Sequence, residues 1–137
     1  MSRINRLIEA LSLISKKDIF SKIKVLTEGE NALLLTIYKS KNGYLSPKEI
    51  TLKMMVTKGR VSNLINVLKE KGYIDIAISN IDRRKLDVFL TINGKNYIES
   101  LVFEIESLLN EVSIKLGDEK TESIIDSLLL FNNVMEG

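Results

Sequence analysis

A run of short polar side chains between residues 57 and 66 has the residue types and the spacing needed to read nucleic-acid bases. Val61, Leu64 and Ile65 recur at helical spacing through this run, so the polar residues lie off the apolar face of a predicted helix. In the major groove of DNA, arginine is suited to guanine and asparagine to adenine. A merely solvated helix face is the alternative interpretation. The polar set consists of Thr57, Lys58, Gly59, Arg60, Ser62, Asn63 and Asn66.

The start of the same helix is suited to a phosphate group. Thr57 is a favourable N-cap, and the unpaired N–H groups of a first helical turn attract anions together with the helix dipole. Gly72 predicts a left-handed end to this helix. Upstream, Ser46-Pro47-Lys48-Glu49 predicts a capping box and a short helix. Two helices separated by so few residues form a helix-turn-helix unit.

A second polar cluster lies further along the chain, at the tip of a predicted β-hairpin. Residues 74–78 and 86–90 each alternate apolar residues with polar or small ones, as strands do. An arginine on a two-stranded projection can enter a minor groove, and Asp82 would orient it through a charge-assisted pair. Alone, such a run is also typical of a solubilising surface. The cations of the tip are Arg83, Arg84 and Lys85.

Helices are predicted on both sides of this core. Apolar residues at helical spacing across residues 4–14 form a stripe that needs a partner. The segment 27–30 has the form of a capping box with Thr27 as its cap, which predicts a second helix from residue 28 to about 40. Another stripe covers residues 98–112, and a last helix follows Gly117. The expected fold is mainly α with a small β-hairpin wing, a winged helix-turn-helix flanked by N- and C-terminal helices.

The amino-acid inventory limits the chemistry. A chain of 137 residues, 45% hydrophobic, is long enough for one ordinary domain. It has no cysteine and no histidine, which excludes disulfides, thiolate nucleophiles, zinc fingers and histidine acid–base catalysis. We therefore expect no enzyme, metal site or cofactor. The sequence lacks an uninterrupted apolar run of about 18 residues and a secretory leader pattern, so we expect a soluble, cytoplasmic protein with no membrane partner.

Charge divides sharply along the chain. Residues 51–95 hold nine Lys and Arg against four acids, and residues 96–137 hold two Lys against nine acids. A basic middle followed by an acidic end fits one segment that meets a polyanion and another that stays clear of it. Two solvated surfaces of opposite sign would show the same distribution, so charge alone does not decide between these alternatives.

Two motifs resemble those of the MarR family of transcriptional regulators. The segment from Asp82 to Gly94 is similar to that family's wing signature, with an Asp-x-Arg tip and a strand ending in Leu-Thr-x-x-Gly. Residues 57–65 and 68–74 are similar to its recognition helix and the glycine that ends it. The resemblance implies one MarR-like domain, in which residues 28–97 form the DNA-binding lobe and residues 1–20 and 98–137 form dimerisation helices.

The resemblance also implies partners and roles. It assigns Arg84 to the minor groove, and Thr57, Lys58, Arg60, Ser62 and Asn63 to groove and phosphate contacts. Because cysteine and histidine are absent, sensing through an oxidised thiol or a histidine-bound metal is excluded. An apolar pocket between the dimer helices and the DNA-binding lobe could accept a small aromatic or anionic effector, as it does in related proteins.

The resulting hypothesis is a homodimer that binds double-stranded DNA at a palindromic operator, represses transcription there and is released by a small ligand. Two alternatives stay open: a SarA-like winged-helix global regulator, and a winged helix used as a protein-interaction module. The sequence leaves the operator, the regulated genes, the effector and the sign of regulation undetermined.

Overall fold

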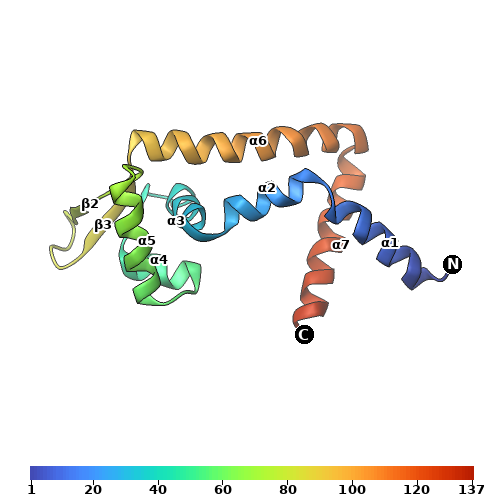
Figure 1. Ribbon diagram of the computed structural model, residues 1–137, viewed down its shortest axis with the longest axis horizontal. Helices are drawn as coiled ribbons and strands as arrows, with labels where there is room; N and C mark the ends of the chain where they lie inside the picture. The colour runs from blue at the N-terminus through green and yellow to red at the C-terminus, as the bar shows by residue number, and fades with distance from the viewer. The chain divides into compact units, whose positions relative to one another are not determined.

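The computed structural model describes all 137 residues as a mainly helical protein with one small sheet (Figure 1). The expected fold class, a winged helix-turn-helix with helices on either side, is confirmed. The elements in chain order are α1 (Arg3–Ser15), α2 (Asp18–Thr27), α3 (Gly29–Tyr38), β1 (Tyr44–Leu45), α4 (Pro47–Met54), α5 (Lys58–Glu70), β2 (Ile74–Ile78), β3 (Leu86–Leu90), α6 (Ile92–Leu116) and α7 (Asp118–Glu136).

The chain divides into two compact units, Met1–Val102 and Phe103–Gly137. The core of the first unit is made by α3, α4 and α5 packed on the sheet. Each of these helices has an apolar face that is removed from water by this packing. Its most deeply buried side chains are Leu33, Leu34, Ile37, Ile50, Val61, Leu68, Ile74, Val88 and Ile98. The core therefore lies directly behind the helix-turn-helix and holds its two helices in a fixed orientation.

The helix-turn-helix begins and turns as the sequence predicts. Ser46 closes a full capping box at the start of α4, accepting from the Glu49 N–H at 3.2 Å while the Glu49 carboxylate accepts from the Ser46 N–H. The helix ends at Met55, whose φ of 56° places it in the left-handed region. Thr57 then caps α5 by accepting from the Arg60 N–H at 3.1 Å. These caps fix where α5 starts, and hence which residues occupy its first turn.

The wing is the antiparallel hairpin β2–β3, which projects from the lobe beside α5 (Figure 1). Its register pairs Ile76 with Val88 and Ile78 with Leu86, so the alternating apolar residues of the two strands lie opposite one another. A third strand, β1, was not expected from the sequence. It pairs only with Val88 and Phe89 of β3, which gives the strand order β1-β3-β2 and leaves the outer edge of β3 unpaired from Asp87 toward the tip.

A tight junction joins the end of α5 to the start of α6. Gly72, with φ of 80°, ends α5 as expected, and its carbonyl accepts from the Thr91 hydroxyl at 2.5 Å. Thr91 also accepts from the Gly94 N–H at 3.1 Å, and its own N–H donates to the Tyr73 carbonyl. The rings of Tyr73 and Tyr97 stack at 4.8 Å. The Leu-Thr-x-x-Gly motif therefore has a structural role, which is to attach α6 to the end of α5.

The helix expected from residue 28 to about 40 is present as α3, but its expected capping box is wrong. Thr27 does not cap a helix but ends α2, a helix the sequence analysis did not predict, and its hydroxyl donates back to the Ile23 carbonyl at 2.8 Å. The cap position of α3 is Glu28, and Glu30 pairs with Lys71 at 2.6 Å instead of reaching back to the cap. The physical reason is that Leu26 is buried, which favours continuing the earlier helix through Thr27.

The helices at the two ends of the chain carry large apolar side chains that are exposed. α1 has no buried residue, and the stripe expected across residues 4–14 is solvent-accessible throughout. In the second unit, Gly117 separates α6 from α7, and α7 likewise buries none of its residues. No helix is both long enough and apolar enough to cross a membrane. Exposed stripes of this length are typical of surfaces that associate with another chain.

Candidate nucleic-acid interface

The polar residues predicted to read DNA are all exposed, on α5 or, for Thr57, at its N-cap. At about 100° per residue, the buried Val61, Leu64, Ile65 and Leu68 define one face of this helix, and Gly59, Asn63 and Asn66 lie on the opposite face. Lys58 and Arg60 flank that exposed face on its two sides. Two amide side chains thus occupy the centre of the accessible surface, with a cation at each margin, which suits a helix lying in a groove between two phosphate backbones.

The wing tip holds one arginine in a defined orientation. Asp82 Oδ1 accepts from the backbone N–H of Arg84 at 3.0 Å and from its Nε at 3.1 Å, and Asp82 Oδ2 accepts from its Nη2 at 3.2 Å. The arginine side chain is nonetheless 90% exposed, against 29% for the aspartate. The carboxylate therefore holds the guanidinium without covering it. That Asp82 orients this arginine for DNA stays a prediction.

The side-chain hydrogen bond from Arg84, followed by its backbone N–H, holds the pKa of Asp82 below its ordinary value. The nearby charge of Lys85 acts in the same direction. Because this pKa is lower in the folded protein than in the unfolded chain, the pair is complete at neutral pH and is lost only as the pH falls through the lowered value. Asp82 is therefore ionised throughout the physiological pH range, where its titration does not disturb the pair.

The turn that carries this pair is stabilised by Ser79, which sequence analysis did not single out. The Ser79 hydroxyl oxygen accepts from the N–H groups of Ile81 and Asp82, at 3.2 and 3.3 Å. Backbone bonds from Ser79 to Lys85 and from Lys85 to Asp82 close the loop. The available signal was its position directly after the last alternating residue, where a serine hydroxyl can organise a turn.

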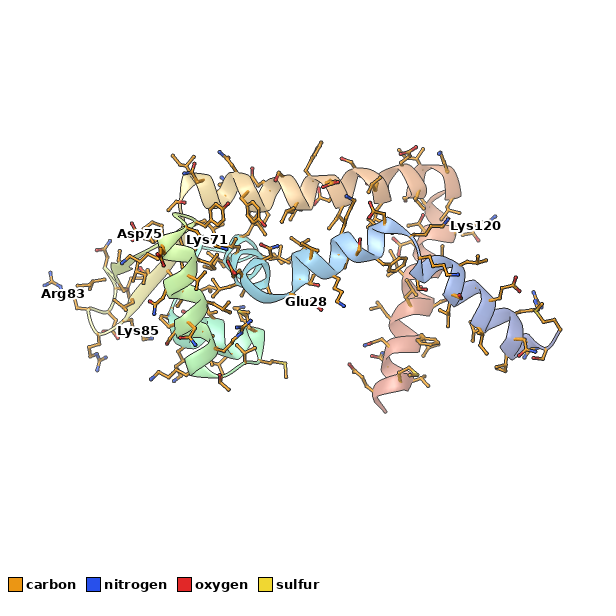
Figure 2. The ribbon with its side chains drawn as sticks, in the orientation of Figure 1. Glu28, Lys71, Asp75, Arg83, Lys85 and Lys120 are labelled. Carbon is orange, nitrogen blue, oxygen red and sulfur yellow. The ribbon has the colours of Figure 1, made fainter.

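Lys71, near the end of the recognition helix, pairs with Glu30 of α3, and this hydrogen bond raises the pKa of Lys71. The remaining tip cations, Arg83 and Lys85, are exposed, and Arg83 extends away from the body of the lobe (Figure 2). The structure thus places one predicted set on α5 and the other on a separate hairpin of the same lobe. Their contacts with DNA stay predictions.

Comparison with known proteins agrees with this geometry. Residues 26–85, which span the helix-turn-helix and the wing tip, match the model of the MarR family. The HTH-type transcriptional repressor YetL of Bacillus subtilis is 27% identical over 103 residues, which cover 75% of this chain and 62% of YetL. The chain thus spans less than two thirds of that relative. The proteins similar to this chain are named as transcriptional regulators and not as enzymes, in agreement with the non-enzymatic role expected from the sequence.

Solved structures match over nearly the whole chain. The transcriptional regulator Tm0710 of Thermotoga maritima is 25% identical, with a TM-score of 0.60, 97% of this chain covered and 94% of that one. FabT of Streptococcus pneumoniae, solved in complex with DNA, is 22% identical with a TM-score of 0.71 and 97% of each chain covered. The resemblance inferred from the wing and recognition-helix motifs is confirmed. Residues 26–85 of this chain are thus similar to the MarR family of winged-helix proteins.

Proposed function

We propose that the protein is a sequence-specific DNA-binding repressor that acts as a homodimer at a palindromic operator. In this proposal α5 lies in the major groove, Asn63 and Asn66 contact base edges, and Arg84 enters the adjacent minor groove. Two copies would read two half-sites about 10 base pairs apart. Binding over a promoter would exclude the polymerase.

The observation that carries this proposal is the contrast between the two cationic elements. On α5 the amide side chains are exposed and unobstructed, whereas at the wing tip a carboxylate holds one guanidinium in place and leaves it accessible. Non-specific binding to a polyanion needs charge alone. An oriented arginine together with exposed amides is the combination that sequence recognition requires.

The test is fluorescence anisotropy with the duplex upstream of the protein's own gene, a scrambled duplex of equal length and a series of salt concentrations. We expect a preference for the native duplex, with one dimer bound per site. If the two duplexes bind equally, selection from a random duplex pool decides the question. A pool that yields no enriched sequence contradicts sequence-specific recognition and favours a protein-interaction module.

Replacing Arg60 by alanine tests how the recognition helix reads its site. If Arg60 makes one bidentate contact to a guanine, discrimination between operator and scrambled duplex should fall by about 1 to 3 kcal/mol. Lys69→Ala is a suitable control, since it removes a charge from the other end of the same helix. Discrimination that survives the Arg60 change, accompanied by a uniform loss of affinity, would make Arg60 a phosphate contact.

The dimer in this proposal is supported by the exposed apolar stripe of α1. Replacing Leu11 by aspartate should lower the mass measured by light scattering toward that of one chain, because a carboxylate buried in an apolar interface without a partner is strongly unfavourable. Ser12→Asp adds the same charge to the same helix outside the stripe and should leave the mass unchanged. A dimer that persists in Leu11→Asp would assign the interface to the C-terminal helices alone.

A further inference from the structure

A pocket of about 570 Å³ lies beside the turn at the tip of the wing, next to α4. It forms where β1 ends and leaves the outer edge of β3 unpaired toward the tip. Its walls come from three places: the turn after α3, the α4 face that carries Glu49 and Lys53, and the wing from Ser79 to Asp87. None of the polar residues assigned above to α5 lines it, whereas Asp82 and Lys85 belong both to the pocket and to the wing tip.

Four lysines line this pocket: Lys39, Lys41, Lys53 and Lys85. The first three form no ion pair, and Lys85 only lies near Asp82. Of the three carboxylates in the lining, Asp82 is paired with Arg84, whereas Glu49 of the capping box and Asp87 keep their charges, so four lysines face two uncompensated carboxylates. No group of three carboxylates is placed to bind a metal ion. The accessible charge is therefore mainly cationic.

The pocket also offers a donor and an apolar wall. Ser79 is only 7% exposed, and because its oxygen accepts both of its hydrogen bonds, its hydroxyl hydrogen is available to a ligand. Tyr44, Leu45 and Ile81 provide an apolar side to the same space. Several ammonium groups and a hydroxyl donor suit the oxygens of a phosphate monoester, and the apolar wall suits a small organic body attached to it.

We propose that this pocket binds a phosphate group, most favourably that of a small phosphorylated molecule, and that its occupancy regulates the wing. The link is Asp82, which lines the pocket and also holds Arg84. A ligand that binds Lys85 and Ser79 changes the surroundings of Asp82. It thereby changes the orientation of Arg84. The regulatory step rests on the proposed DNA-binding function, whereas phosphate binding itself does not.

The experiment uses the full chain and phenyl phosphate as the probe, with phenol as the neutral analogue. Amide NMR shifts should change saturably for residues 39–44 and 79–87 with phenyl phosphate and not with phenol. The variant carrying Lys39→Gln, Lys41→Gln and Lys53→Gln should bind the probe at least about tenfold more weakly. A second variant, with Lys16→Gln, Lys17→Gln and Lys120→Gln, loses the same charge outside the pocket and should bind like the parent.

The same two variants separate the sources of the phosphate. If phenyl phosphate does not bind but the pocket variant alone loses duplex affinity with a shallower salt dependence, the group comes from the DNA backbone and the site stands. Equal behaviour of both variants toward probe and duplex, or equal binding of phenol and phenyl phosphate, overturns the proposal. Saturable, lysine-dependent probe binding in a protein that shows no duplex preference would retain the pocket and reject the DNA-binding function.

Discussion

Replacing Arg84 by alanine is expected to weaken operator binding by roughly 1.5 to 3 kcal/mol, the usual value of a hydrogen bond to a charged group. The physical reason is that this guanidinium is exposed and already held by Asp82, so its side chain loses little further conformational entropy on binding. Arg84→Lys keeps the charge but cannot make the bidentate ion pair with Asp82, and should recover only part of the lost operator affinity. Anisotropy at fixed salt measures both variants.

Arg83→Ala is the matched control, because Arg83 carries the same charge at the neighbouring position and has no such ion pair. Its loss of affinity should be smaller and should be screened by salt. Light scattering should give the same mass for all three variants. Operator affinity that does not change in Arg84→Ala would remove the wing from the recognition mechanism.

Gly94→Ala should lower the free energy of unfolding by about 2 to 3 kcal/mol, because overpacking in a tight contact is costly. A Cβ at this position would lie 1.9 Å from the Tyr73 carbonyl oxygen. That oxygen cannot withdraw freely, since it accepts the Thr91 N–H at 3.1 Å. Urea unfolding followed by circular dichroism measures the change.

Gly59→Ala provides the comparison, because a Cβ there meets nothing within 4 Å and the residue lies inside α5. Alanine is a better helix former than glycine by about 1 kcal/mol, so this variant should be as stable as the parent or more so. Equal unfolding midpoints for Gly94→Ala and the parent would show that the junction between α5 and α6 can rearrange around the added methyl group without loss of stability.

Local sequence chemistry was sufficient to predict the parts of the fold that depend on neighbouring residues. Ser46 and Thr57 cap the two helices of the helix-turn-helix as expected, and Gly72 ends the second. The wing strands follow from their alternation, since a period of two is incompatible with a helix. The pairing of Asp82 with Arg84 was also predictable, because the two residues lie two positions apart in one turn.

The features that were missed depend on contacts between distant residues. Thr27 fits a capping pattern equally well at a helix start or a helix end, and the burial of Leu26 decides between the two. β1 is two residues long, too short for any alternation to show. The stacking of Tyr73 on Tyr97 and the pairing of Glu30 with Lys71 join positions far apart in sequence, which no local pattern reports.

The two ends of the wing differ in how firmly they are attached, which determines how they open. At the base, the Thr91 and Gly94 amides are hydrogen-bonded within a junction that includes stacked rings. At the tip, Ile81 is 88% exposed, and the loop is held by hydrogen bonds within the turn itself, among Ser79, Asp82, Arg84 and Lys85. Amide hydrogens at the base should therefore exchange with solvent deuterium only through large openings of the lobe, while those at the tip exchange through small local ones.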